Sequence, residues 1–426
     1  MNQSAPLQIV FKNIHKANSH TLPVYLKGGG YKAMAEALAK TPEEVINEVK
    51  TSGIRGRGGA GFPAGIKWSF IPKASTKPKY LVCNADEGEP GTCKDRDILR
   101  FDPHLLIEGM VIAAFAVGSE RGYIYIRGEF FLESQRVEGA IREAYAKGYL
   151  GDNILGTGVR FDLAVHLGAG AYVCGEETAL LESLEGKKGQ PRVKPPFPAN
   201  VGLWGGPTVI NNVETLASIP AILEHGGSWY AGLGVEKSTG TKIFSVSGHV
   251  NRPGNYEVEM GLPLKRLLEE YAGGVRGGWD NLKGVIPGGS SSPVLGKQVC
   301  ETVTMDYDSI ARAGSMLGSG AVVVMDKSVC IVRAIARISR FYRHESCGQC
   351  TPCREGTGWL SQIVTRIEAG GGQPGDIELL EELCGNISGK TICALGDAAA
   401  MPVAGAIRAF RDEFVYHVEH GRCLVE

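Results

Sequence analysis

The segment ESCGQCTPCREG, residues 345–356, places three cysteines at two-residue intervals: Cys347, Cys350 and Cys353. This spacing lets one tight loop or first helical turn present three thiolates to a single compact group, and thiolates are the usual ligands of cubane iron–sulfur clusters. Structural zinc more often uses two separate Cys-x-x-Cys pairs, so zinc is the lesser alternative. The chain must therefore fold so that a fourth ligand reaches the same point.

The residues directly after this motif do not supply the fourth ligand. The run CREGTGWLSQIV lacks the x3-Cys-Pro continuation of bacterial ferredoxins, and the downstream candidates are Cys384, Cys393 and Cys423. Cys384 ends a helical pattern, where a buried apolar cysteine is the default, and Cys423 lies in a tail that we expect to fray. Cys393 lies on a short connection between two predicted helices. It is therefore the preferred fourth ligand of one 4Fe-4S cluster.

Composition excludes several classes of protein. The formal charge of −1 and the lack of a long basic run give no reason to expect nucleic acid. The longest apolar stretch, 109–118, is about half of what a bilayer crossing needs. The N-terminus lacks a secretory pattern, and 11 cysteines without one do not indicate a disulfide framework. We expect a cytoplasmic protein that associates with a membrane only through partners.

Strand and helix patterns alternate over the first half of the chain. The predicted helices are 41–53, 104–118, 134–151, 176–186 and 209–227, and the predicted strands are 79–83, 122–130 and 160–170. Alternation of this kind indicates an α/β fold with a mainly parallel sheet and with ligand sites at the strand ends. Residues 1–40 are expected to form a weakly patterned extension, and the Pro-rich run 190–207 to be irregular.

The pattern changes after about residue 240. Residues 241–261 predict a hairpin with an Arg-Pro-Gly-Asn turn, followed by a short helix at 263–274 and further strands to about 325. This is a small α+β domain, and helical patterns follow it to the end of the chain. The expected domains are therefore 1–238, 239–326 and 327–426.

Two glycine-rich segments suggest nucleotide binding. The segment 53–61 contains a formal GxGxxG fingerprint, but a predicted helix precedes it, so the usual Rossmann use is not supported. Its bare backbone N–H groups beside Arg57 and Lys67 favour a phosphate nest, with a tightly packed structural loop as the alternative. In the second segment, 166–181, Glu176 and Glu177 begin a helix, where acids simply favour the helix dipole. They also disfavour bare phosphate, so a ring or ribose is the better ligand there.

Six segments together resemble a known family. In order they are GRGGAGFPAGIKW, NADEGEPG, GAGAYVCGEETALLESLEG, INNVETL, ESCGQCTPCREG and ICALGDAA. The pattern resembles the NADH-binding flavoprotein subunit of respiratory complex I, the proton-pumping NADH:quinone oxidoreductase, from about residue 20 to 420. The resemblance implies a Rossmann-like FMN and NADH domain, a β-grasp-like (ubiquitin-like) domain and a C-terminal helical bundle that carries the 4Fe-4S cluster.

The resemblance also implies residue roles. Those for the flavin phosphate and ribityl chain are Gly56, Arg57, Gly58, Gly59 and Lys67. Those that line the flavin are Asn84, Asp86, Glu87, Tyr172, Gly175, Glu176, Asn211 and Asn212, although an acidic turn such as 84–91 is by itself most simply a solvated one. Those that receive NADH are Phe62, Phe70, Glu89, Glu177, Lys194 and Phe197, with Glu177 and Glu89 nearest the chemistry. The cluster ligands would be Cys347, Cys350, Cys353 and Cys393.

The implied activity is NADH dehydrogenation. NADH gives two electrons as a hydride and a cubane accepts one, so FMN must mediate between them. The charge of Glu177 is expected to disfavour reduced flavin and to weaken NADH binding. A thioredoxin-like 2Fe-2S subunit and a large multi-cluster subunit are implied as partners. The alternatives are the diaphorase subunit of a soluble hydrogenase or formate dehydrogenase, a non-catalytic electron-transfer module, and a zinc-stabilised scaffold.

Overall fold

The computed structural model describes residues 7–425, which divide into two compact units. The first unit runs to residue 88 and also includes 93–243 and 257–261. The second contains 89–92 and 244–256, and then everything from residue 262 onward. The chain thus crosses between the units several times, and the α+β segment and the C-terminal helices share the second unit.

The first unit is built on a parallel sheet, as the alternating pattern predicts. Its order is β3-β2-β1-β4. The strands are β1 (Tyr80–Ala85), β2 (Arg121–Ile126), β3 (Asp162–Leu167) and β4 (Thr208–Asn212). The register aligns Asn84 of β1 with Asn212 of β4, so these two amides come to the same carboxyl edge. The prediction of an unbroken helix at 209–227 was wrong, because its first residues form strand β4 and the helix starts only after Asn212.

Helices of the first unit surround this sheet. They are α1 (Leu22–Lys27), α2 (Lys32–Leu38), α3 (Pro42–Thr51), α4 (Ala64–Ser69), α5 (Lys94–Phe101), α6 (Pro103–Val117), α7 (Phe131–Ala146), α8 (Glu177–Leu184), α9 (Val213–His225) and α10 (Gly227–Ala231). Helix α3 begins after Thr41, close to the predicted start of the helix 41–53, and Thr41 and Glu44 form a reciprocal capping box there. The prediction that residues 1–40 form a weakly patterned extension was wrong for the part that the structure describes. Helices α1 and α2 lie there, and the backbone amides of Val10 and Phe11 donate to the buried carboxylate of Glu257.

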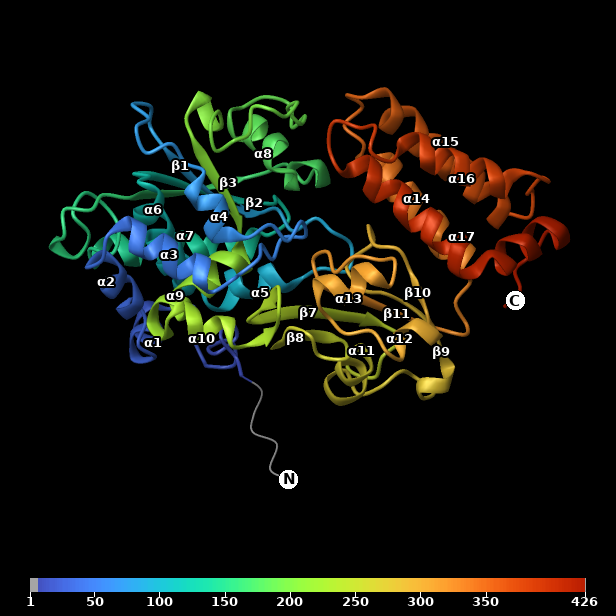
Figure 1. The fold of residues 1–426 in the computed structure, drawn as a ribbon, viewed down its shortest axis with the longest axis horizontal. Coiled ribbons are helices and arrows are strands. Elements are labelled where there is room, and N and C mark those ends of the chain that lie inside the picture. The colour runs from blue at the N-terminus through green and yellow to red at the C-terminus, as the bar shows by residue number, and fades with distance from the viewer. Residues whose placement is uncertain (1–6, 426) are drawn as a thin grey trace. The chain divides into compact units, whose positions relative to one another are not determined.

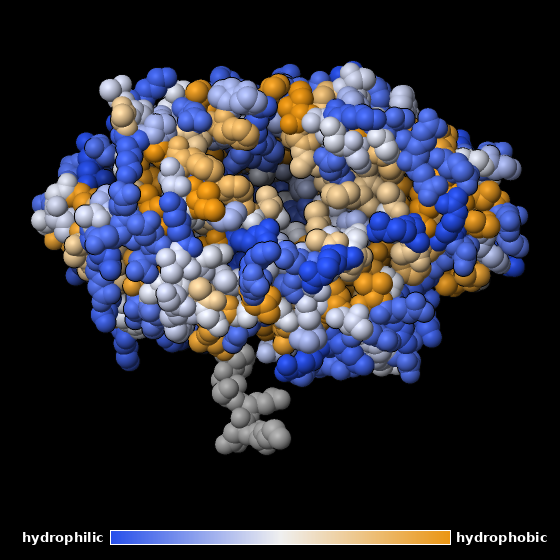
Figure 2. Space-filling model, in the orientation of Figure 1, coloured by the Kyte–Doolittle hydropathy of each residue, from blue (hydrophilic) through white to orange (hydrophobic). Residues whose placement is uncertain are grey.

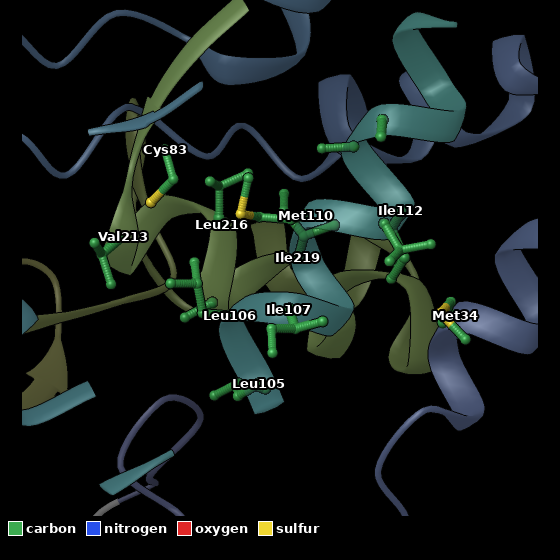
Figure 3. Packing of buried hydrophobic residues seen from close by; sticks show 14 of the residues in the cluster. Met34, Cys83, Leu105, Leu106, Ile107, Met110, Ile112, Val213, Leu216 and Ile219 are labelled. Atoms are coloured by element: carbon green, nitrogen blue, oxygen red, sulfur yellow. The ribbon is translucent and has the colours of Figure 1, made fainter. Parts of the chain in front are cut away.

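Helix α6 forms the centre of the hydrophobic core. It is apolar on all sides and almost wholly buried, as expected of a helix without a polar face. Figure 3 shows its Met110 with Leu216 and Ile219 of α9 in one cluster that also includes Cys83 of β1. A Cβ at Gly109 would lie 2.0 Å from the Leu216 carbonyl oxygen, so only glycine allows this approach of α6 to α9.

Most residues of a mixed sheet, in the order β10-β9-β11-β7-β8, belong to the second unit. The strands are β7 (Thr241–Gly248), β8 (Gly254–Glu259), β9 (Leu282–Ile286), β10 (Leu295–Gly296) and β11 (Ala321–Asp326), and the helices between them are α11 (Leu264–Arg266), α12 (Lys297–Cys300) and α13 (Tyr307–Arg312). Strand β11 runs parallel to β7 and antiparallel to β9. The predicted pairing of β7 with β8 is confirmed, whereas the predicted helix at 263–274 is short and ends in a π-type turn.

Four longer helices complete the second unit. They are α14 (Ile331–Glu345), α15 (Thr351–Glu368), α16 (Asp376–Ile387) and α17 (Leu395–His420). They pack side by side as a bundle, drawn in orange to red in Figure 1. Helix α14 buries Ile331, Val332 and Ile335 on one face and exposes its arginines on the other. The helical pattern predicted for this part of the chain is confirmed, and α14 is amphipathic.

Hydrophilic residues cover much of the face drawn in Figure 2, where they are interrupted by separate apolar patches. Among residues 7–425, every helix is too short or too polar to cross a bilayer.

Candidate functional site

The first glycine-rich segment is a loop between α3 and α4 that is tied to the start of α9. The amide of Gly56 donates to the carbonyl of Phe62 at 2.8 Å, which closes the loop on itself. The amide of Arg57 donates to the Thr215 hydroxyl at 2.8 Å. A helix precedes this loop, as predicted, and the loop is held as a rigid stretch of exposed backbone.

The next two glycines leave this backbone uncovered. Gly58 is exposed, and a Cβ there would lie 3.0 Å from the Cβ of Asn212. Gly59 has φ +131°, which side-chain-bearing residues rarely adopt. Lys67, on α4 shortly after the loop, adds a cation beside it. The loop thus has the amide donors and the nearby charge of an anion nest.

The side chain of Arg57 extends below the loop, into the interior of the unit. Its guanidinium is fully buried and donates to the Thr239 carbonyl at 2.7 Å. This geometry makes Arg57 a support of the glycine loop from beneath, and its positive charge lies under the exposed amides.

The carboxyl ends of β1 and β4 bring several predicted residues together. The amide of Asn84 donates to the Gly175 carbonyl at 2.8 Å, which joins the end of β1 to the second glycine-rich segment. The side chain of Asn211 accepts from the indole of Trp68 at 2.8 Å. Asn212 caps α9 by accepting from the amides at the start of that helix. The sequence could propose these amides only through the resemblance, because an isolated Asn pair has no diagnostic spacing.

Four charged side chains, Lys67, Glu176, Glu177 and Lys194, form what we call the lysine–glutamate cluster. Glu177 lies 2.9 Å from the ammonium of Lys67 and 2.9 Å from that of Lys194. Glu176 also pairs with Lys194 at 2.9 Å, and its second oxygen accepts from the amides at the start of α8. The capping interpretation is thereby confirmed for Glu176. The two lysines balance both acids, which the sequence did not predict.

The charge of Glu177 is fixed by this cluster. Burial alone would raise the pKa of its carboxyl, but Lys67 and Lys194 outweigh burial and lower the pKa to about 2. Glu177 is therefore ionised at any physiological pH. Its side chain remains about a quarter exposed, so a bound molecule can still reach it.

A second set of charges, Arg57, Glu87, Lys94, Asp95, Glu214 and Lys242, is buried beneath the strand ends, and we call it the buried charge network. Lys94 pairs with Asp95 at 2.7 Å and with Glu214 at 2.9 Å. Lys242 lies 3.4 Å from Glu214. Sequence reasoning named only Arg57 and Glu87 of this network. The segment INNVETL contained Glu214, but a single acid on a helix carries no signal of burial.

Two members of this network titrate far from their usual range. Burial and the neighbouring Asp95 raise the pKa of Glu87 to about 8, although two backbone amides donate to its carboxylate. Burial lowers the pKa of Lys242 to about 7. The carboxylates around Lys94 outweigh its burial and raise its pKa, so its ammonium stays charged beneath the strand ends.

Three predicted aromatic residues are exposed in the first unit. Phe62, Phe70 and Phe197 are 47%, 53% and 55% exposed. The rings of Phe62 and Phe70 lie 6.0 Å apart between centroids and form a small aromatic platform beside the glycine loop. Phe197 lies in the Pro-rich run 190–207, which the structure confirms to be irregular apart from one 3-10 turn. Tyr172 begins the turn that precedes α8.

Glu89 belongs to the second unit. Its carboxylate accepts from the Ser291 amide at 2.8 Å and from the Ser290 hydroxyl at 3.2 Å. A Cβ at Gly289 would lie 2.5 Å from the Cγ of Glu89, so a bare backbone is needed beside it. Glu89 is thus held by a serine and glycine loop of its own unit.

Three of the predicted cluster cysteines, Cys347, Cys350 and Cys353, lie in the second unit at the start of α15. Cys350 is the N-cap of that helix, and Cys353 is buried in its first turn. Cys393 lies in the connection to α17, which packs against α15. Cys384 is buried inside α16 and its thiol donates to the Ala400 carbonyl at 3.4 Å. Such a thiol already has a partner within the bundle.

The residues present fit both cofactors. The glycine loop with the buried guanidinium of Arg57 behind it suits the phosphate of FMN, and the Asn amides at the strand ends suit the polar edge of an isoalloxazine ring. The Cys-x-x-Cys-x-x-Cys segment turns at the first residues of a helix, which suits a cubane.

Family models match three consecutive parts of the chain. Residues 49–221 match the Nuo51 FMN-binding domain, residues 242–324 match the SLBB domain, and residues 333–417 match the NADH-ubiquinone oxidoreductase-F iron-sulfur binding region. Together with the site geometry, these matches define the class: an FMN- and iron–sulfur-dependent subunit of an NADH dehydrogenase.

Relatives that match nearly the whole chain identify the family within this class. The NADH-quinone oxidoreductase F subunit of Rickettsia bellii is 58% identical over 410 residues, which cover 96% of this chain and 98% of the relative. That of Rickettsia felis is 59% identical over 404 residues, covering 95% and 96%. The chain belongs to the family of NADH-quinone oxidoreductase F subunits.

A solved structure shares the fold. The crystal structure of an NAD+-reducing NiFe-hydrogenase in the H2-reduced state has a chain with a TM-score of 0.83 and 37% identity. The match covers 93% of this chain but only 66% of the hydrogenase chain. The predicted fold class is confirmed, with an FMN-binding parallel-sheet region, an SLBB region and a helical 4Fe-4S region.

Proposed function

We propose that this chain oxidises NADH through its own FMN site and delivers the electrons to the 4Fe-4S cluster of its bundle. The observation that carries the proposal is the presence, in one chain of this family, of an FMN-binding region at 49–221 and an iron–sulfur region at 333–417. Bound FMN accepts a hydride from NADH and gives up its electrons singly, which the cluster requires.

In this proposal the glycine loop binds the flavin phosphate. Gly58 and Gly59 contribute backbone amides, Gly56 shapes the loop through its bond to the Phe62 carbonyl, and Arg57 and Lys67 contribute charge. The flavin is lined by Asn84, Asp86, Glu87, Tyr172, Gly175, Glu176, Asn211 and Asn212. Asn84, Asn211 and Asn212 are already held by hydrogen bonds to Gly175, Trp68 and Asp95, and orientation is what hydride transfer demands of the protein.

The NADH residues have separate roles. Phe62, Phe70 and Phe197 offer exposed rings for the adenine. Lys194 and Glu177 hold each other at 2.9 Å, so each orients the other toward ribose and nicotinamide. Glu89 is proposed as a further contact for the nucleotide.

Glu177 limits the affinity of the site for nucleotide anions. Its ionised carboxylate repels further negative charge at the start of α8, where the flavin ring would lie. Lys67 and Lys194 weaken this repulsion without abolishing it. NADH can therefore bind, and the oxidised product can leave.

We propose Cys347, Cys350, Cys353 and Cys393 as the cluster ligands and 1–238, 239–326 and 327–426 as the domains. The family name implies partner subunits, for which a thioredoxin-like 2Fe-2S subunit and a large multi-cluster subunit are proposed. The chain would then lie on the cytoplasmic side, peripheral to the inner membrane through the assembled complex.

One experiment tests the hydride-to-cluster route. Protein purified without oxygen should contain about one acid-releasable flavin and about four irons per chain, and NADH should bleach both absorptions while NADPH leaves them unchanged. Iron without flavin, or a spectrum that does not respond to NADH, would contradict the proposal. A diaphorase role like that of the hydrogenase has less support, because that chain is 37% identical whereas the Rickettsia subunits reach 59%.

A further inference from the structure

Cys423 does not lie in a frayed tail, as the sequence had suggested. It follows the last turn of α17, yet it is only 5% exposed. Its partners in the interior are Cys330, the N-cap of α14, and His417, in the last turn of α17. The ligand atoms of these three side chains all lie within 4.8 Å of one another. We call this group the Cys–His–Cys cluster.

The cluster is separate from the proposed iron–sulfur site. Cys330 precedes α14 and Cys347 follows it, and a helix of 15 residues is about 22 Å long. The iron–sulfur motif therefore lies at one end of α14 and the Cys–His–Cys cluster at the other. The function of the chain uses none of the three residues.

The geometry of the cluster suits a small soft cation. The Sγ of Cys330 lies 3.3 Å from Nε2 of His417, and a tetrahedral zinc site holds thiolate and imidazole at about 2.3 and 2.0 Å from the metal. The three side chains are 5%, 1% and 5% exposed, so the bundle shields them from competing water. We propose that Cys330, His417 and Cys423 bind one zinc ion.

The surroundings support a cation here. Cys330 accepts from the Arg333 amide at 3.3 Å, so a backbone N–H points at its sulfur. A divalent ion supplies the charge that releases both thiol protons to solvent. Glu413 lies one helical turn before His417 and accepts from the amide of Ile331, and its carboxylate pairs with Lys283. Because Lys283 balances its charge, Glu413 adds no unpaired negative charge beside the three proposed ligands.

The orientation of the imidazole suits a metal. Its Nε2 faces the Sγ of Cys330 at 3.3 Å, and its Nδ1 is buried. A metal binds the neutral imidazole, and binding through Nε2 would leave the proton on Nδ1, inside the bundle.

The site would fasten the C-terminal segment to the bundle. Cys330 begins the first bundle helix, while Cys423 follows the last. A zinc ion between them closes the bundle at the end opposite the iron–sulfur motif. This is a structural role and does not depend on electron transfer.

Metal analysis of the full-length holoprotein tests the proposal. Preparations with about four irons per chain are used, because zinc can then not be occupying an empty cluster site. Zinc is measured after incubation with one equivalent of zinc chloride and removal of excess by a weak chelator. We expect about one zinc per chain, reduced at least fivefold in Cys423→Ser and in His417→Gln, with iron and flavin unchanged. Cys300→Ser is the matched control, because Cys300 is equally buried but donates to the Leu295 carbonyl.

Three results would overturn the proposal: wild-type protein without zinc, zinc that both variants retain, or a Cys330–Cys423 disulfide in the untreated protein. If the variants do not fold, X-ray absorption spectroscopy of the wild-type protein at the zinc edge identifies the ligands instead. Two sulfur neighbours at about 2.3 Å and one imidazole support the site, whereas oxygen neighbours alone contradict it.

Discussion

Lys194 and Glu177 lie 2.9 Å apart, and Lys67 lies 2.9 Å from the same carboxylate. Glu177 is thus an ionised acid that two cations share, in the first turn of a helix where a phosphate would otherwise be favoured. Removal of its charge leaves the two lysines with only Glu176 to balance them. This arrangement yields the first prediction.

Glu177→Gln should tighten nucleotide binding. We expect the Kd of NADH and of NAD+ to fall roughly 3- to 10-fold, about 1 kcal/mol, and product release to slow. Because the pKa of Glu177 is lowered to about 2, its ionic contribution is present above its unfolded value near 4.5 and lost only as pH falls toward 2. The effect should therefore be constant across neutral pH. Equilibrium titration and flavin potentiometry measure it.

Glu182→Gln is the control for this variant. Glu182 also lies on α8 and pairs with Arg192 and Lys187, away from Lys67 and Lys194. It should leave nucleotide affinity unchanged. If Glu177→Gln matched this control in both affinity and flavin potential, the role given to Glu177 would be wrong.

The buried carboxyl of Glu87 should make stability depend on pH. Its folded pKa is raised to about 8, so its protonated form stabilises the fold fully below about 4.5, and this contribution is lost as pH rises through about 8. Glu87→Gln keeps a neutral side chain at every pH. The variant should lose less stability than wild type between mildly acidic and mildly alkaline pH, by about 1–3 kcal/mol.

Thermal unfolding midpoints at several pH values measure the effect of Glu87→Gln. Exposed Glu138 on α7 offers a control, and Glu138→Gln should follow the wild-type pH dependence. A Glu87→Gln profile parallel to that of wild type would show that the carboxyl is ionised in the fold.

The glycine loop can be tested without changing charge. A Cβ at Gly58 would lie 3.0 Å from Asn212, so Gly58→Ala must shift either the loop or the cap of α9. A strain of about 1–3 kcal/mol would weaken FMN binding roughly 5- to 100-fold. Gly139→Ala on α7 is the control, because its Cβ meets only the flexible Arg142 at 3.9 Å. Flavin content after gel filtration compares the two, and equal retention would contradict the nest.

The sequence predicted elements wherever a periodic pattern and a cap coincide. Thr41 and its capping box set the start of α3, and the alternating elements predicted a parallel sheet that was confirmed. Strand β4 was missed because VINN is too short for a period and continues directly into α9. The buried N-terminal residues were missed because Val10 and Phe11 are held by Glu257, a contact across more than 200 positions.

The site was predictable only in part. The cysteine spacing alone indicated a cubane, because three of its ligands lie close together in the sequence. The buried charge network had no such signal, since Lys94, Asp95 and Glu214 resemble surface residues until the fold encloses them. Cys423 was misjudged for the same reason, because its burial depends on α14, which begins more than 90 positions earlier.

The choice of the fourth cluster ligand can be tested by two single substitutions. Cys393→Ser should lower bound iron from about four to three or fewer per chain and broaden or abolish the cluster's low-temperature EPR signal. Cys384→Ser should keep its iron, because that thiol is buried and donates to the Ala400 carbonyl. Full iron in Cys393→Ser with loss in Cys384→Ser would reverse the assignment.

The aromatic platform should determine NADH affinity more than flavin binding. Phe70 is 53% exposed and its ring lies 6.0 Å from that of Phe62, so neither ring is needed to fill the core. Phe70→Ala removes one stacking surface, which we expect to cost about 0.5–1.5 kcal/mol and to raise the KM for NADH roughly 2- to 10-fold, with flavin content and kcat unchanged. Steady-state kinetics with an artificial acceptor measure this, with Phe131→Ala as the control, since Phe131 is 65% exposed at the start of α7. A loss of kcat instead of affinity would place Phe70 near the hydride step and not at the adenine.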